Sequence, residues 1–203
     1  MKIFKGLALT SALTFACSSA IAESMSWSYL AAYYDSSKSE LEGYKKDLDG
    51  NSFVFEGSYA PIDHFSVIAG YANASAEIDE WPRVKEDGQG YFLGGLYYTP
   101  LKPSVDFYAG ARAFRYTYDF YVNKYHTGNE KLYGKGIFTG LRGMLSKNIE
   151  LNGMVEYSKF EDESSTDLTL EASYYILPSV ALSTGISVDS DSKSVKVGVL
   201  KSF

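Results

Sequence analysis

Ten segments that alternate apolar residues with small or polar ones fill the chain from Trp27 to Phe203. They cover residues 26–34, 51–60, 65–74, 90–98, 105–118, 132–145, 149–158, 166–175, 180–188 and 194–203. A period of two puts alternate side chains on opposite faces of a β-strand. A membrane helix needs about 20 consecutive apolar residues, and none of the segments provides them. The pattern therefore predicts an all-β fold of ten antiparallel strands.

The two faces of each predicted strand differ in polarity. In the second segment, Phe53, Phe55 and Tyr59 share one face, whereas Glu56 and Ser58 share the other. Lipid offers the backbone no hydrogen-bond partners, so strands cross a membrane only as a closed barrel. A Lys or Arg on the lipid face near the midplane costs about 2–4 kcal/mol, so the apolar face must meet the lipid. The sequence predicts an antiparallel transmembrane β-barrel with a polar lumen.

Aromatic side chains assigned to the apolar face gather near both ends of the strands. One group comprises Trp27, Tyr59, Phe65, Tyr97, Phe107, Tyr174 and Phe203, and the other comprises Tyr33, Phe53, Tyr71, Tyr91, Tyr133 and Tyr157. Amphipathic rings are enriched at the two headgroup levels of a membrane. A soluble β-sandwich also has alternating strands, but it gives no reason for two aromatic belts. The membrane barrel is the better interpretation.

Short and long connections alternate along the chain. Four prolines fall in the predicted short turns, where a missing N–H breaks no ladder; they are Pro61, Pro100, Pro103 and Pro178. The other connections are mostly longer and polar, among them 35–50, 75–88 and 119–131. Outer-membrane barrels have short periplasmic turns and longer external loops, and an even strand number returns both termini to the periplasm. Eight strands, with one hairpin outside the membrane, remain an alternative.

Residues 1–22 have the parts of a secretory signal peptide. These parts are a positive start at Lys2 and Lys5, an apolar stretch at 7–16, and small residues at Ala20 and Ala22. We expect cleavage before Glu23, which leaves 23–203 as a single outer-membrane β-barrel domain. Cys17 raises a lipoprotein alternative, but Thr14 stands where a lipoprotein signal has leucine.

The exported chain is expected to be acidic and free of cysteine. Cys17, the one cysteine, leaves with the signal peptide, so disulfides and thiolate metal sites are excluded from the mature protein. The formal net charge of −6 falls to −8 when Lys2 and Lys5 are removed. Such a chain, without a basic patch, is a poor binder of nucleic acid.

Charged residues recur on the polar face of the strands, which a barrel turns toward its lumen. They are Glu56, Asp106, Arg112, Arg142, Glu150, Glu156 and Glu171. Eight strands enclose a space that side chains just fill, so ten strands give a narrow bore. Buried charges persist only when they are paired and hydrogen-bonded. We therefore predict an ion-pair network that fills much of the lumen, with a restricted solute path as the alternative.

The residues that catalysis would require are not arranged for it. His64 directly follows Asp63 in a predicted periplasmic turn, whereas the ten-stranded outer-membrane proteases carry a spaced Asp-x-His element at the outer rim. His126 is followed by Thr127 and Gly128, so it lacks the His-x-Ser element of the lipid A deacylases. A base without a nucleophile in reach is not a triad. We predict no enzymatic activity and no catalytic or cofactor-binding residues.

Two acidic segments are candidate cation sites with simpler interpretations. Asp189 and Asp191 could hold a cation with oxygen ligands, although a polar hairpin turn is the better account. The acidic run 161–163 could bind the divalent cations that bridge lipopolysaccharide, but such a run is usually a solvated loop face. We predict no metal site.

Several local patterns resemble those of a known family. They are the hairpin sequences 49–59, 65–71 and 105–110, and the C-terminal residues Lys196, Gly198 and Phe203. In these residues the chain resembles the small porin-family β-barrel proteins of the Gram-negative outer membrane. The C-terminal pattern is similar to the family's assembly signal, although Lys201 stands where an apolar residue is usual. The resemblance implies contacts with the barrel-assembly machinery, periplasmic chaperones, outer-membrane lipid and lipopolysaccharide, and it says little about function.

We predict a monomeric, non-enzymatic surface or envelope protein of the cell outer membrane, with a narrow and largely filled lumen. A low-conductance, porin-like channel for small solutes is one alternative. Another is an adhesin or receptor that acts through the external loops. Those loops hold Tyr44, Trp81 and Tyr125, and such rings often anchor protein contacts.

Overall fold

The computed structural model describes residues 25–39, 48–78, 83–123, 125–160 and 163–203. The predicted signal peptide with its cleavage site, the loop rings Tyr44 and Trp81, and two residues of the acidic run lie outside these ranges. Within the described ranges, no helix is long and apolar enough to span a membrane.

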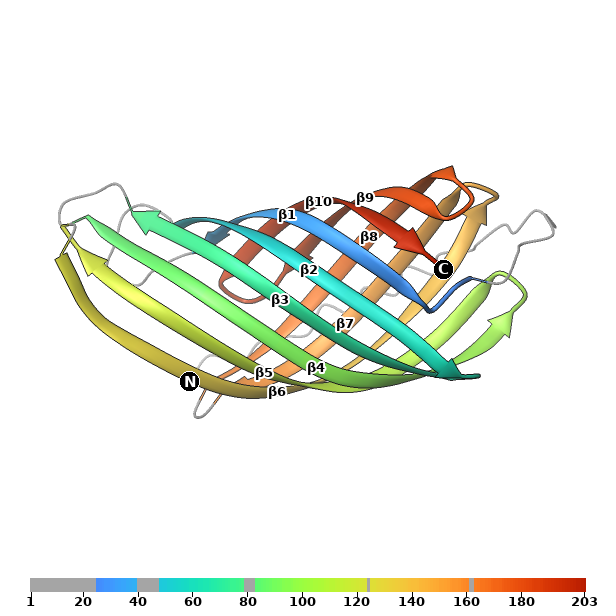
Figure 1. Ribbon diagram of the computed structural model, residues 1–203, viewed down its shortest axis with the longest axis horizontal. Coiled ribbons are helices and arrows are strands. Elements are labelled where there is room, and N and C mark those ends of the chain that lie inside the picture. Colours follow the sequence, from blue (N-terminus) through green and yellow to red (C-terminus); the bar gives the residue numbers. More distant parts are fainter. Residues whose placement is uncertain (1–24, 40–47, 79–82, 124, 161–162) are drawn as a thin grey trace, which may run out of the picture.

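The described residues form one closed sheet of ten β-strands (Figure 1). The strands are β1 Tyr29–Ser39, β2 Leu48–Ile62, β3 Phe65–Ile78, β4 Val84–Lys102, β5 Val105–Val122, β6 Tyr125–Ser146, β7 Ile149–Phe160, β8 Glu163–Leu177, β9 Val180–Val188 and β10 Ser192–Ser202. Each strand pairs antiparallel with its neighbours in the chain, and β10 pairs with β1 to close the barrel. The prediction of ten strands is confirmed, and the eight-stranded alternative is wrong.

The barrel is apolar outside and polar inside. Phe55, Leu93 and Ile137 on the outer face are 56%, 62% and 64% exposed. Arg142 and Glu156 inside the barrel are each only 4% exposed. A soluble protein would bury the first group and expose the second, whereas lipid solvates the outer face of a membrane barrel. This distribution confirms the expected polarity of the two faces.

Two aromatic residues that we assigned to the membrane belts lie inside the barrel instead. Trp27 is 6% exposed and Tyr33 is 7% exposed. Trp27 precedes β1, so strand alternation does not determine where its side chain points. In β1 both faces carry large side chains, with Tyr29 and Tyr33 inward and Leu30 and Tyr34 outward. Hydropathy alone therefore could not decide the face of Tyr33.

The strands are longer than the sequence pattern predicts. The segments 75–88 and 119–131, expected as external loops, belong mostly to strands β3 to β6. Polar side chains do not prevent the backbone from pairing once a strand has left the lipid. The hydropathy pattern therefore marks where the apolar belt ends rather than where the strand ends.

Strands β4, β5 and β6 project beyond the rest of the barrel, at the left of Figure 1. β4 and β5 stay paired as far as Val84 and Val122, whereas β6 meets β7 only from Gly134 and Phe160 onward. We name the projecting part the outer ribbon, and it comprises residues 84–90, 116–122 and 125–132.

Two prolines lie inside strands rather than in turns, contrary to expectation. Pro61 is in β2 and Pro100 is in β4. Each coincides with a register shift, so the missing N–H falls at an irregularity where it breaks no ladder bond. Pro103 and Pro178 lie in two-residue turns, as predicted.

The seam between β1 and β10 closes the sheet. It pairs the whole of β1 with residues 192–202. Gly198 lies under the ring of Tyr33, because a Cβ at Gly198 would be 2.4 Å from Cδ1 of Tyr33 and 2.4 Å from the carbonyl oxygen of Ala32. A side chain at this position would push the two seam strands apart.

Gly198→Ala should destabilise the refolded barrel, because the added methyl group meets the Tyr33 ring and the backbone of β1. Overpacking of this kind typically costs about 1–3 kcal/mol. The measurement is the urea midpoint of the folded form, scored by its mobility in unheated gels. Gly128→Ala is the matched control, since a Cβ at Gly128 meets nothing within 4 Å. Equal midpoints for the two variants would show that the seam absorbs the methyl group without strain.

Candidate functional site

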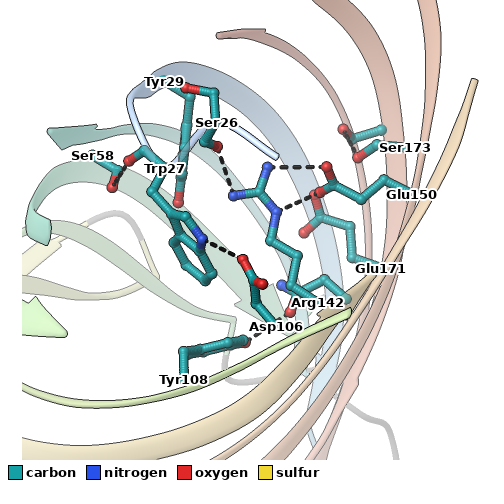
Figure 2. A network of polar contacts seen from close by, with 12 residues as sticks. Ser26, Trp27, Tyr29, Ser58, Asp106, Tyr108, Arg142, Glu150, Glu171 and Ser173 are labelled. Atoms are coloured by element: carbon teal, nitrogen blue, oxygen red, sulfur yellow. Dashed lines mark hydrogen bonds and ion pairs between the residues drawn. The ribbon is translucent and has the colours of Figure 1, made fainter. Parts of the chain in front are cut away.

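One end of the lumen is filled by the residues that precede β1 (Figure 2). The indole Nε1 of Trp27 donates a hydrogen bond to Asp106 Oδ2 at 2.8 Å. The indole stacks on Tyr98 with ring centroids 4.7 Å apart. The backbone carbonyl oxygen of Trp27 accepts a hydrogen bond of 2.7 Å from Ser58 Oγ. Residues 26–28 thus form a plug, here called the Trp27 plug, held by side chains of β2, β4 and β5.

A buried arginine ties the plug to the barrel wall. Arg142 Nε and Nη2 donate to the Glu150 carboxylate at 2.7 and 3.0 Å, and Nη1 donates to the carbonyl oxygen of Ser26 at 2.9 Å. Its guanidinium lies 4.9 Å from the centroid of the Trp27 ring, and Tyr175 Oη donates to Glu150 at 3.0 Å. The two-pronged pair and its extra donors meet the condition under which a buried charge is tolerated.

A second arginine–glutamate pair lies further along the lumen, toward the outer ribbon. Arg112 Nε donates to Glu156 Oε1 at 2.8 Å, and Nη2 donates to Oε2. The guanidinium is 5.0 Å from the ring centroids of Phe92 and Phe114 and 5.7 Å from that of Phe138. Ring faces carry partial negative charge, so these rings stabilise the cation on the sides that its carboxylate does not reach.

A third ion pair joins β8 to β10. Lys196 Nζ is 2.5 Å from Glu171 Oε2, with side chains that are 22% and 9% exposed. The ammonium lies 4.5 Å from the centroid of the Tyr33 ring, and Tyr33 Oη donates to Glu171 at 3.3 Å. We assigned Lys196 to the C-terminal assembly pattern and not to the lumen charges. In the sequence, Lys196 alternates with the outward Val195 and Val197, and this pattern already places the lysine on the inner face of the strand.

The structure brings the predicted lumen charges together in pairs rather than in one network. Four of them form the two Arg–Glu pairs, and Glu171 pairs with Lys196. Glu56 instead accepts a hydrogen bond from Tyr29 Oη at 2.5 Å, and Asp106 accepts from the Trp27 indole. Neither of these two carboxylates makes an ion pair with a described residue. Hydroxyl and indole donors take the place that we expected cations to fill.

A small cavity remains between the three ion pairs. Its volume is about 100 Å³, and its lining includes Glu56, Arg112, Arg142, Glu171 and Lys196. A water molecule occupies about 30 Å³ in the liquid, so the cavity has room for only a few waters. Side chains of both charge signs line it.

The turn between β9 and β10 uses its carboxylate internally. Asp189 Oδ1 accepts from the N–H groups of Asp191 and Ser192 at 2.7 and 2.6 Å, and Oδ2 accepts from Ser192 Oγ at 2.6 Å. Partial burial opposes ionisation here, but the hydrogen bonds outweigh it and lower the pKa of Asp189. A polar turn accounts for this carboxylate. The described residues contain no group of three or more His, Cys, Asp or Glu that could hold a metal ion.

The two histidines lie far apart in the fold, and they contact a backbone carbonyl, an aspartate and tyrosine rings. His64 occupies the β2–β3 turn with a φ of 67°, and its Nδ1 is 3.0 Å from the carbonyl oxygen of Tyr98. His126 lies on the outer ribbon, with Nε2 3.3 Å from Asp119 Oδ1 and its ring edge-on to Tyr121. Neither imidazole hydrogen-bonds a hydroxyl or thiol of a described residue, so neither is arranged to activate such a nucleophile there.

The three residues of the C-terminal pattern have different environments. Lys196 is in the lumen, Gly198 lies under Tyr33, and the ring of Phe203 is 65% exposed on the outside. The N–H of Phe203 donates to the carbonyl oxygen of Ser28 at 3.1 Å, so the residue extends the seam. Recognition of these residues by an assembly machinery stays a prediction.

Known proteins match this chain in structure but not in sequence. No protein-family model and no curated protein matches it. The translocator domain of the autotransporter NalP from Neisseria meningitidis matches with a TM-score of 0.58 and 11% identity, over 89% of this chain and 90% of that chain. Neisserial surface protein A has a TM-score of 0.49 and 15% identity, over 88% and 98%. Ail, the attachment invasion locus protein of Yersinia pestis, has 0.49 and 16%, over 87% and 97%.

The match to the NalP translocator covers nearly all of both chains. It agrees with this chain's own closed sheet and apolar outer face. The chain has the fold of an outer-membrane β-barrel. At such low identity the likeness concerns the fold alone. What this outer-membrane β-barrel does must therefore be argued from its own lumen and surface.

Arg142→Ala should lower the free energy of unfolding of the refolded barrel by about 3–5 kcal/mol, because it leaves Glu150 buried without its cation. Adding Glu150→Gln to this variant should restore part of the loss. The measurement is a urea titration in detergent micelles. Lys38→Ala is the control, because the Lys38–Asp49 pair has side chains that are 70% and 69% exposed and surface pairs contribute about 0–1 kcal/mol. An equal loss in both variants would mean that water reaches Glu150.

Proposed function

We propose that this protein is exported to the cell outer membrane, spans it as a monomeric, non-enzymatic barrel with a closed lumen, and acts through its external surface. The observation that carries the proposal is the lumen itself, which contains three ion pairs and, at one end, the Trp27 plug. The apolar outer face and the sequence of residues 1–22 support the location.

The filling of the lumen favours a closed barrel over a channel for small solutes. A solute on the barrel axis would have to displace the Trp27 ring and separate Arg142 from Glu150. Removing one partner of such a pair costs about 3–5 kcal/mol, and the cavity of about 100 Å³ between the ion pairs has room for only a few waters. Passage of a solute therefore requires that the Trp27 plug first move out of the lumen.

The outer ribbon supports a role at the surface, including that of an adhesin or receptor. Tyr125, at the start of β6, is 78% exposed, and exposed aromatic rings often anchor contacts between proteins. Biogenesis through periplasmic chaperones and the barrel-assembly machinery, and contact with lipopolysaccharide once inserted, belong to the same proposal. They rest on the C-terminal pattern and on the apolar belt.

Refolded wild-type protein should give no stepwise current across a planar bilayer, because the plug and the ion pairs fill the bore. The double variant Trp27→Ala with Arg142→Ala should give discrete steps, since it removes the plug's ring and the cation that holds it. Tyr125→Ala, which removes an exposed ring outside the lumen, should behave as wild type. Discrete steps from the wild-type protein would overturn the closed lumen and establish the channel alternative.

The orientation can be tested by single-cysteine labelling, because the mature chain is expected to contain no cysteine of its own. Cysteines that replace Asn129 or Ser190 should react with a membrane-impermeant maleimide on intact cells. Cysteines that replace Asp63 or Lys147, in two-residue turns at the opposite end, should react only after the outer membrane is permeabilised. The reverse pattern would invert the proposed orientation, and labelling of all four on intact cells would contradict a spanning barrel.

A further inference from the structure

As β5 leaves the barrel, each of four consecutive residues on its inner face carries an aromatic ring. Phe114, Tyr116, Tyr118 and Phe120 form this aromatic ladder, with successive ring centroids 6.1, 5.9 and 6.4 Å apart. Phe114 is buried beside Arg112, whereas the other three rings are only partly buried. Apolar ring surface thus continues from the lumen onto the outer ribbon.

Glycines of the neighbouring strand β4 let these rings lie flat on the sheet. Gly90 pairs with Tyr116, and Gly88 pairs with Tyr118. A Cβ at Gly90 would be 2.3 Å from the Tyr116 ring, and one at Gly88 would be 2.9 Å from the Tyr118 ring. Both rings therefore cover the backbone of β4, and the Tyr116 ring also lies beside Phe160 of β7, with ring centroids 5.7 Å apart.

The outer part of the ladder lies beyond the lipid. Tyr91, 54% exposed, is the last large aromatic side chain on the outer face of β4. Further out, the same face carries Gln89, Asp87 and Lys85, and Lys85 Nζ is 2.7 Å from Asp87 Oδ2. Neither lipid nor a barrel core surrounds Tyr118 and the ring after it. The rings are partly exposed, and apolar surface that neither lipid nor a core covers commonly marks a binding site.

Two carboxylates flank the ladder on the same inner face. In the sheet register Glu86 lies opposite Phe120, and Glu130 lies opposite Tyr118. Neither makes an ion pair with a described residue, although the outward Asp87 on the same strand has its lysine partner. Burial, and then the negative charge of Glu130, raise the pKa of Glu86. A cation placed between the two carboxylates would relieve this repulsion.

We propose that Tyr116, Tyr118 and Phe120, together with Glu86 and Glu130, bind an aliphatic polyamine, an organic cation with more than one ammonium group. Ammonium groups are attracted to ring faces and donate charge-assisted hydrogen bonds to carboxylates. Two carboxylates beside one row of rings match a chain that carries two separated charges. An anionic ligand is repelled by both carboxylates, and a neutral sugar leaves their charge uncompensated. The site captures its ligand at the outer surface and requires no open lumen.

Isothermal titration of refolded, full-length protein in micelles with spermidine tests the site. Tyr118→Leu and Glu86→Gln should each weaken spermidine binding about fivefold or more, which corresponds to the loss of one cation–ring or cation–carboxylate contact. Tyr118→Phe keeps the ring face and should bind as wild type. Tyr121→Leu is the matched control, because it removes a ring from the opposite face of the same strand and should change nothing.

The mobility of unheated samples in gels shows whether each variant is folded. If Tyr118→Leu does not fold, Glu86→Gln still tests the proposal. Absence of spermidine binding to the wild type, or unchanged affinity in Tyr118→Leu and Glu86→Gln, overturns the proposal. If Mg²⁺ displaces spermidine equally well from the wild type and from Tyr118→Leu, the site binds cations through charge alone. Binding of maltotriose that is lost in Tyr118→Leu would reveal a sugar site. Either result also overturns it.

Discussion

Inside the lipid, every backbone N–H and C=O of this chain must find its partner in the protein, because hydrocarbon offers none. The ten strands meet this demand by closing on themselves through the β1–β10 seam, which removes both sheet edges. The other features follow from closure. Alternate residues are forced into a narrow bore, Gly198 must stay small beneath Tyr33, and Pro61 and Pro100 are confined to register shifts.

The bore in turn dictates how charge is handled. Arg142 is buried and Arg112 is partly buried, and each is paired with a glutamate, but their remaining surroundings differ. Arg142 uses a backbone carbonyl of the plug, whereas Arg112 is enclosed by phenylalanine rings. Glu56 and Asp106 are satisfied by a phenol and an indole. Each charge is stabilised locally, so a substitution at one pair should leave the other pairs largely intact.

The sequence was sufficient wherever a single rule decided the outcome. The alternation of Phe53 with Glu56 assigns faces because the pleat of a strand has a strict period of two. The rule fails for Trp27, which lies before the first strand, and for Tyr33, whose strand has large side chains on both faces. Strand ends were missed because backbone pairing continues through polar residues outside the lipid. The individual partners in the lumen could not be predicted, because they depend on the stagger of strands around the closed barrel.

The residues before β1 belong to the Trp27 plug and to the seam at once. The carbonyl oxygen of Ser28 accepts the N–H of Phe203 at 3.1 Å, and Ser26 Oγ donates to the carbonyl oxygen of Phe203 at 3.0 Å. The carbonyl oxygen of Ser26 meanwhile accepts from Arg142 in the bore. The end of the β1–β10 seam therefore forms on the same residues that hold Trp27 in the lumen, so closure of the wall and placement of the plug depend on shared hydrogen bonds. In the closed barrel that we propose, completing the wall at the seam also fills the bore with the Trp27 side chain.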